Sequence, residues 1–179
     1  FLDNPIPIHS AIGDSNGAMY AQGCHNRGDC MTGYGTGSSV MINIGDLVIL
    51  SDQGLVTSVA WRTNGQTSFM LSGVINYSGA VITWLIESLG LVNTPQETDG
   101  VASTANPGDR TYLVPAFTGI GAPYWSNRAN AIFSGMTRLT GRAELVRATL
   151  ESIAYQIADV VFSISKTSGV SVTEMKVSG

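Results

Sequence analysis

The sequence predicts a single α/β domain, because strand-like runs fill the first half of the chain and helical patterns fill much of the second. Asn64-Gly65 between two apolar runs is typical of a β-hairpin, since a type I′ turn needs positive φ at both central residues. Apolar residues at 3.6-residue spacing follow Ser78 and Gly141. The 179 residues are 44% hydrophobic and 12% charged, which favours one folded core and argues against disorder.

The first half is predicted to be mostly β. An apolar stretch ends in the tight turn Gly13-Asp14-Ser15-Asn16-Gly17, which indicates a strand followed by a turn. Two further pairs of apolar runs flank the glycine-rich segment 35–37 and the Asn-Gly turn. The predicted strands are residues 6–12, 31–34, 39–44, 54–62 and 67–73.

The second half is predicted to hold two helices. Ser78 can cap the first, and Gly90 is placed to stop it. The second and longest helix extends from near Gly141 to Ser168, and Gly169 ends it. The remaining segments are predicted as a long surface loop over 93–109, a strand over 112–117 that enters the turn 119–125, and a final strand over 170–177.

Charge and cysteine content exclude several classes of function. Lys and Arg number 9 against 13 Asp and Glu, without a basic cluster, so nucleic acid is not an expected partner. The longest apolar run, around 40–50, is far shorter than the ~20 residues of a membrane helix, so no membrane span is expected. Cys24 and Cys30 form neither a disulfide framework nor a zinc set, which favours a reducing, cytoplasmic location and no metal ligands. Both chain ends are expected to be cuts through a larger protein.

Asp14 is a candidate general base, although an Asp in a glycine-flanked turn is more often a turn former. The same turn matches G-x-S-x-G with Ser15 at its centre, which leaves a serine hydrolase as an alternative. Such an enzyme needs a histidine base after its serine, and the chain offers only His9 before Ser15 and His25 shortly after it.

Gly35-Thr36-Gly37 is a candidate phosphate-binding loop. Its glycines allow backbone N–H groups to approach phosphate oxygens, and the Thr36 hydroxyl adds one donor. The alternative is a glycine-rich hairpin with no ligand. Neither a Walker P-loop nor a dinucleotide-binding motif occurs in the chain.

Taken together, these segments resemble the C-terminal domain of the FGGY carbohydrate kinases, the family of glycerol, xylulose and related sugar kinases. The resemblance covers essentially the whole chain. It rests on Gly13-Asp14 with Gln22-Gly23-Cys24, Tyr34-Gly35-Thr36-Gly37, Ser78-Gly79-Ala80 with Trp84-Leu85, the run from Phe117 to Trp125, and the signature from Ala131 to Gln156.

The resemblance implies an actin-like, ribonuclease H-like ATPase domain, with a mixed sheet and flanking helices, incomplete at both ends. Residues 1–179 would then be a partial C-terminal FGGY kinase domain. The N-terminal sugar-binding domain would be its missing partner, and the end of the nucleotide site would lie beyond the chain. Self-association into a homo-oligomer stays open.

The resemblance also implies roles for individual residues. Asp14 resembles the base that takes the proton from the sugar hydroxyl, with ATP and Mg²⁺ as cofactors. Gly35, Thr36 and Gly37 resemble the ATP phosphate loop, and Gly79 and Thr83 fall where the family places nucleotide contacts. Glycerol kinases usually carry Gln at the Thr83 position. Tyr124 and Trp125 are expected to be structural.

The resemblance implies an ATP-dependent kinase acting on a sugar or polyol. Ser15 stands where glycerol kinases usually carry Gln, and Ser39 where they place an aromatic side chain. Small side chains at these two substrate-facing positions favour a longer acceptor, such as the ketose xylulose, with glycerol as the alternative. A third possibility is a non-catalytic assembly module.

Overall fold

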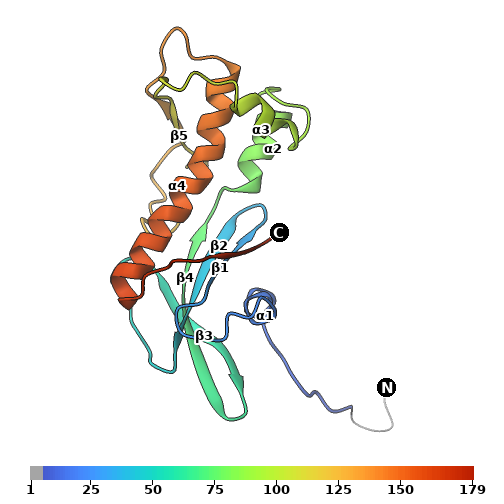
Figure 1. The fold of residues 1–179 in the computed structure, drawn as a ribbon, viewed down its shortest axis with the longest axis vertical. Coiled ribbons are helices and arrows are strands. Elements are labelled where there is room, and N and C mark those ends of the chain that lie inside the picture. Colours follow the sequence, from blue (N-terminus) through green and yellow to red (C-terminus); the bar gives the residue numbers. More distant parts are fainter. Residues whose placement is uncertain (1–5) are drawn as a thin grey trace.

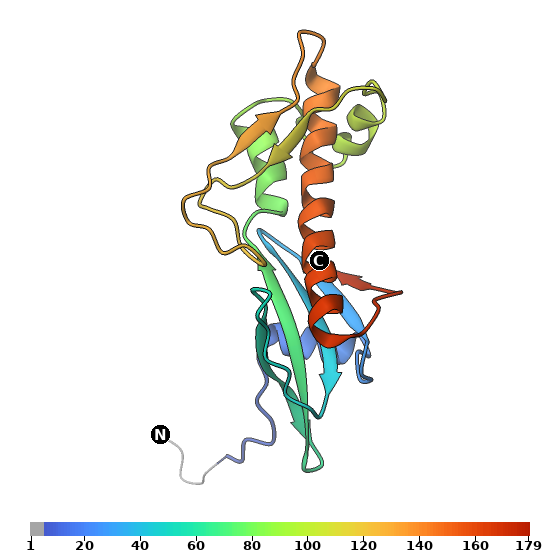
Figure 2. The same ribbon diagram turned by 90° about the vertical axis from the view of Figure 1, so that its left-hand side faces the viewer.

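The computed structural model describes residues 6–179, which form an elongated molecule with a β-sheet at one end and a helical layer at the other (Figures 1 and 2). The longest helix, α4, extends along both parts and connects them. The helices are α1 (Asp14–Ala21), α2 (Gly79–Glu87), α3 (Glu97–Ala102) and α4 (Arg142–Ser168). The strands are β1 (Cys30–Tyr34), β2 (Ser38–Gly45), β3 (Val56–Thr63), β4 (Gln66–Ile75), β5 (Tyr112–Val114), β6 (Ile132–Ser134) and β7 (Lys176–Ser178).

The main sheet has five strands in the order β3-β4-β2-β1-β7, and β7 lies parallel to β1 while the other pairs are antiparallel. The predicted α/β class with a mixed sheet is therefore confirmed. The predicted β3–β4 hairpin is also confirmed. Its turn residues Asn64 and Gly65 have φ of 48° and 80°, as a type I′ turn requires.

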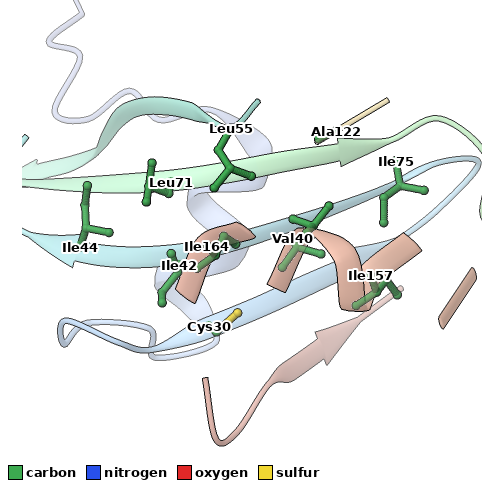
Figure 3. Close-up of a cluster of buried hydrophobic side chains, with 11 residues drawn as sticks. Cys30, Val40, Ile42, Ile44, Leu55, Leu71, Ile75, Ala122, Ile157 and Ile164 are labelled. Carbon is green, nitrogen blue, oxygen red and sulfur yellow. The ribbon is translucent and has the colours of Figure 1, made fainter. Parts of the chain in front are cut away.

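One face of the sheet packs against the second half of α4 (Figure 3). Alternate residues of β2 point toward this helix, as the two-residue period of a strand dictates, and Val160 of α4 lies among them. Gly73 of β4 permits the close approach, because a Cβ there would lie 2.5 Å from Val160 Cγ1. The buried aliphatic members of this core include Val40, Ile42, Ile44, Leu71, Ile75, Ile157 and Ile164.

The opposite face of the sheet carries α1. The fully buried Met19 of α1 packs with Met31, Met41 and Met70 from the sheet and with Trp61 of β3. Unbranched methionine side chains fill irregular gaps, which suits the packing surface of a helix only eight residues long. The sheet therefore separates α1 from α4.

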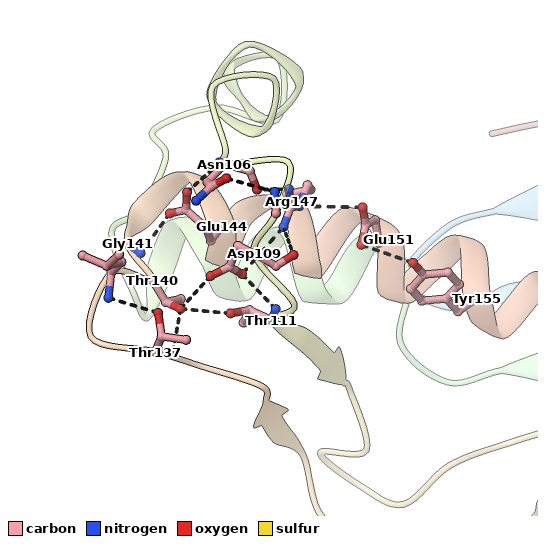
Figure 4. A network of polar contacts seen from close by, with 12 residues as sticks. Asn106, Asp109, Thr111, Thr137, Thr140, Gly141, Glu144, Arg147, Glu151 and Tyr155 are labelled. Carbon is pink, nitrogen blue, oxygen red and sulfur yellow. Dashed lines mark hydrogen bonds and ion pairs between the residues drawn. The ribbon is translucent and has the colours of Figure 1, made fainter.

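The first half of α4 packs in the helical layer against α2, α3 and the two-stranded sheet of β5 and β6. Glu144 fixes the start of α4, because its carboxylate accepts hydrogen bonds from the backbone N–H groups of Gly141 and Asn106, both at 2.9 Å (Figure 4). Arg147 donates to the carbonyl oxygens of Asn106 at 2.7 Å and Asp109 at 3.0 Å. These bonds attach the loop before β5 to the helix.

Four predictions about secondary structure differ from the structure. Residues 6–12 form an exposed, irregular segment, so Asp14 begins a helix and does not end a strand. Pro7 in this segment has no backbone donor, and none of the described strands pairs with the segment. The predicted loop 93–109 contains α3. This helix begins at Glu97, the last residue of the sequence Thr94-Pro95-Gln96-Glu97, which is typical of helix N-termini.

The third error concerns the last strand, which was expected over 170–177. Only Lys176–Ser178 pairs with β1, because Val170, Val172 and Met175 pack on the α4 face of the core as an irregular chain. The strand expected over 112–117 is likewise shorter and ends at Val114. Among residues 6–179, no helix is both long and apolar enough to cross a membrane.

Candidate functional site

Two hollows meet at the tip of the β1–β2 hairpin. The first has a volume of about 460 Å³ and is lined by Asp14 and Ser15 of α1 and by Ser39 of β2. The second, of about 440 Å³, is lined by Thr36, Gly79, Ala80 and Thr83. Gly35 lines both hollows. The structure thus places the predicted acceptor residues in one hollow and most of the predicted nucleotide residues in the next.

Asp14 is the first residue of α1 and is exposed to solvent at the first hollow. Its Oδ1 atom accepts a hydrogen bond from the Ser15 backbone N–H at 2.7 Å and a long one from Ser15 Oγ at 3.5 Å. Its Oδ2 atom has no protein partner among the described residues. The carboxylate can therefore accept a hydrogen bond or a proton from a bound hydroxyl group.

The hairpin tip is attached to the start of α2 (Figure 1). The backbone N–H groups of Ser78 and Ala80 donate to the Thr36 carbonyl oxygen, both at 3.0 Å, and the Gly79 N–H donates to the Gly35 carbonyl oxygen at 2.9 Å. These carbonyl groups satisfy helix N-terminal donors that usually need a cap. The predicted side-chain cap by Ser78 is absent, since its hydroxyl makes no capping bond.

The same arrangement leaves donors free on the hairpin tip. Among residues 6–179, the backbone N–H groups of Thr36 and Gly37 have no backbone acceptor, and the Thr36 hydroxyl has no protein partner. Thr36 is exposed, and it lines the second hollow beside the N-terminus of α2. Unpaired N–H groups near a helix N-terminus are suited to binding an anion.

Two of the glycines have structural reasons for lacking a side chain. A Cβ on Gly37 would lie 2.4 Å from the Ile75 carbonyl oxygen, and one on Gly79 would lie 2.5 Å from the Gly35 carbonyl oxygen. A Cβ on Gly35 meets nothing closer than 3.5 Å, so packing within this chain does not demand a glycine there. Gly79 also uses its N–H on the loop, which makes that group unavailable to a nucleotide.

Thr83 lies one turn into α2 and is exposed. Its hydroxyl makes a long hydrogen bond, 3.4 Å, to the Gly79 carbonyl oxygen of its own helix. This weak internal bond leaves the hydroxyl able to contact a molecule in the second hollow.

The structure does not bring a histidine to Ser15. His25 Nε2 lies 2.9 Å from the carbonyl oxygen of Tyr20, at the far end of α1, and its ring packs against Tyr20 and Trp61. His9 lies in the exposed segment before the helix. In the part of the chain that the structure describes, Ser15 therefore has no base to activate it, and the serine hydrolase alternative lacks support.

The cysteines also offer little chemistry. Cys24 and Cys30 are both free and buried. Burial, followed by the neighbouring Cys24, raises the pKa of Cys30 to about 12, and burial raises the pKa of Cys24. Both stay as unreactive thiols near neutral pH. The described residues also include no group of three or more acidic, histidine or cysteine side chains that could hold a metal ion.

Sequence reasoning missed two residues that line the first hollow and one in the helix beside it. Ser178 of β7 lines it, because β7 pairs with β1 beside Gly33. Ser38 also lines it, and its buried hydroxyl has no partner among the described residues. Asn16 does not line this hollow but lies in α1, and it attaches that helix to β3 through two hydrogen bonds. Only contacts distant in sequence reveal these positions.

Tyr124 and Trp125 lie away from both hollows. The Tyr124 hydroxyl donates to Asp159 of α4 at 3.0 Å, and the Trp125 indole N–H donates to the Gly54 carbonyl oxygen. These bonds connect the segment after β5 to α4 and to the loop before β3. A structural role of the two residues at the junction with another domain stays a prediction.

Comparisons with family models and with curated proteins point to the same family. The model of the C-terminal domain of the FGGY family of carbohydrate kinases matches residues 30–179. The glycerol kinase of Halobacterium salinarum is 42% identical over 180 residues, which cover all of this chain and 35% of that protein. The chain thus spans about a third of the length of its curated relatives.

Solved structures agree with this result. The structure of Plasmodium falciparum glycerol kinase with ADP matches at a TM-score of 0.89 and 33% identity, covering 97% of this chain and 35% of the other. A ligand-bound xylulose kinase from Lactobacillus acidophilus matches at a TM-score of 0.77 but only 23% identity, covering 89% and 32%, so it supports the fold alone. The predicted fold is thus that of these kinases, and the chain belongs to the FGGY family of carbohydrate kinases.

Proposed function

We propose that the complete protein transfers the γ-phosphoryl group of ATP to a hydroxyl group of glycerol. The observation that carries this proposal is the pair of hollows that share Gly35, with Asp14 in one and Thr36 in the other. A phosphoryl transfer needs an acceptor site and a nucleotide site in direct contact, which this geometry can provide.

Glycerol replaces the ketose as the favoured acceptor. The expectation of a ketose rested on the small side chains of Ser15 and Ser39, which leave room in the first hollow. Similarity favours the alternative, because glycerol kinases match the whole chain at 42% identity while the xylulose kinase reaches only 23%. The extra room at Ser15 and Ser39 has to be filled by water or by groups outside this chain.

The reaction assigns one task to each hollow. The acceptor hydroxyl oxygen forms a bond to the γ-phosphorus, the bond from that phosphorus to the β,γ-bridging oxygen breaks, and the hydroxyl proton passes to Asp14. Because the transition state is loose, the larger contribution of Asp14 is to orient the hydroxyl group. The Thr36 hydroxyl and the N–H groups of Thr36 and Gly37 would stabilise phosphate oxygens.

The nucleotide would enter as its magnesium complex. Mg²⁺ commonly binds substrate phosphates together with one or two carboxylates, and it would neutralise charge on the transferred group. The described residues provide no cluster for the ion. The resemblance to the family implies a magnesium-binding acid in the N-terminal domain that we propose as the partner of residues 1–179.

The test is acceptor-dependent ADP release by the complete protein with glycerol, xylulose, ribulose and gluconate in parallel. We expect glycerol to be the best acceptor. Asp14→Asn should abolish turnover, because the amide neither accepts the proton nor presents the charged acceptor that orients the hydroxyl group. Ser15→Ala should retain a substantial rate. Fluorophosphonate labelling of Ser15, or full activity of Asp14→Asn, would contradict the proposal.

A further inference from the structure

Helix α1, which carries Asp14, has few attachments to the rest of the molecule. It is eight residues long, and Met19 is its only buried residue. The segment before it is exposed and pairs with no described strand. Gly13 precedes the helix and supplies no side-chain cap. The other packing contacts of α1 lie in its second half, where Ala18 packs beside Met19 and the Tyr20 ring contacts Trp61. They would leave the first turn, and with it Asp14, poorly fixed.

Asn16 provides the missing attachment. Its side-chain Nδ2 group donates to two successive carbonyl oxygens of β3, those of Val59 at 2.9 Å and Ala60 at 2.8 Å. Val59 and Ala60 are 43 and 44 positions from Asn16 in the sequence. The bond to Ala60 is partly buried, and the bond to Val59 is exposed. One amide therefore connects the first turn of α1 to the edge of the sheet.

A β-bulge makes this contact possible. Successive carbonyl groups of a regular strand point to opposite edges, so a single amide cannot reach both. The pairing of β3 with β4 shifts register between Val59 and Trp61, which leaves Ala60 as the extra residue. Because β3 is the edge strand of the sheet, no neighbouring strand of the sheet competes for the two carbonyl groups.

We propose that Asn16 is a positioning residue that holds Asp14 in the first hollow by joining α1 to the bulge of β3. Asn16 touches no substrate in this role, and its catalytic part rests on the proposed kinase function. The two residues lie within one turn of the same helix, so a rotation of that turn moves the Asp14 carboxylate directly. A small displacement of a group that orients the nucleophile is costly to turnover.

The test compares Asn16→Ala with Asn43→Ala in the complete protein. Asn43 is a matched control, because its Nδ2 group also donates to a backbone carbonyl, that of Cys24 at 3.0 Å, but it fixes the loop after α1. Two measurements are made on each variant: hydrogen exchange at the Gly17 N–H, which donates to Gly13 at 2.7 Å in the first turn, and glycerol kinase kinetics.

We expect Asn16→Ala to accelerate exchange at Gly17 and to lower kcat about tenfold, with both KM values changed by no more than about threefold. Asn43→Ala should lower the melting temperature while leaving Gly17 exchange and kcat near wild type. Asn16→Gln keeps the amide but places it one methylene farther out, so Gly17 exchange and kcat should lie between those of wild type and Asn16→Ala. If Asn16→Ala does not fold, this variant tests the proposal in its place.

Unchanged exchange at Gly17 in Asn16→Ala would overturn the inference whatever the activity. Accelerated exchange with unchanged kcat would overturn the link to Asp14, and so would an equal loss of kcat in Asn43→Ala. Wild-type protein that turns over no glycerol would contradict the proposed function separately, and the exchange data would still decide whether Asn16 fixes the helix.

Discussion

Thr36 is the residue at the hairpin tip whose side chain can donate a hydrogen bond, and its hydroxyl is free of protein partners within residues 6–179. Removing one donor to a charged oxygen costs about 1.5 to 3 kcal/mol. Thr36→Ala should therefore lower ATP-dependent rates by roughly tenfold to a hundredfold, since one decade corresponds to about 1.4 kcal/mol. Steady-state kinetics with varied ATP measure this loss, while the KM for glycerol should change little.

Substitutions of the two glycines around Thr36 test folding and ligand binding separately. Gly37→Ala should mainly lower the melting temperature, because its Cβ would clash with the Ile75 carbonyl oxygen at 2.4 Å. Gly35→Ala has space within this chain, so it should keep its melting temperature and weaken ATP binding only. Normal ATP kinetics in both Gly35→Ala and Thr36→Ala would leave the segment as a hairpin without a phosphate-binding role.

Among the helices, α4 depends on an ionised carboxylate at its start. The backbone N–H groups of Asn106 and Gly141 hold the pKa of Glu144 below its ordinary value of 4.5. A pKa that is lower in the folded state means that this stabilisation is complete above 4.5 and is lost as the pH falls through the folded value. Glu144 thereby makes the stability of α4 sensitive to acid.

Glu144→Gln should lower the melting temperature at pH 7, and the difference from wild type should shrink as the pH falls below 4.5 and through the lowered pKa of the folded carboxylate. Thermal melts recorded at about every pH unit between pH 3 and 8 would measure this difference. Glu87→Gln, at an exposed carboxylate in the last turn of α2, is the matched control and should differ little from wild type throughout. A difference for Glu144→Gln that is independent of pH would contradict this role.

Elements with a strong local pattern could be predicted from the sequence. The Asn64-Gly65 hairpin and the stripe of α4 with its stop at Gly169 are of this kind, since their causes lie within a few residues. The segment 6–12 alternates as a strand does, but a strand also needs a partner, and partners depend on the whole fold. Helix α3 is hard to predict because Pro95 and Gly100 are typical of loops, although Thr94-Pro95 is also a typical helix start.

The candidate site likewise contains residues that could be predicted from the sequence and residues that could not. Asp14, Ser15 and the 35–37 loop could be found because short motifs mark them, and the structure places them around two hollows that share Gly35. Asn16 lay within the same motif but gave no separate signal, because its partners are 43 and 44 residues away on a bulge. The structural demand on Gly37 and Gly79 likewise depends on where Ile75 and Gly35 lie.

At the scale of the whole molecule, the chain spans about a third of its relatives, and both hollows lie on its surface. Several large apolar side chains are exposed, among them Ile8 at 87%, Leu50 at 83% and Phe162 at 71%. An interface that lacks its partner domain would leave apolar side chains exposed in the isolated chain. We therefore expect the isolated 179-residue chain to self-associate, and to release no ADP with ATP, Mg²⁺ and glycerol, because a phosphoryl transfer needs both substrates enclosed and oriented.

Light scattering after gel filtration and a coupled ADP assay test this expectation, with the complete protein as the matched control. The complete protein should turn over glycerol under the same conditions, and Asp14→Asn in that protein sets the background. Because the two hollows meet at Gly35 within this chain, any positioning that they achieve alone would appear as a low but Asp14-dependent rate. Such a rate from the isolated chain would mean that residues 1–179 contain the whole catalytic arrangement, and that the proposed N-terminal partner is not required for chemistry.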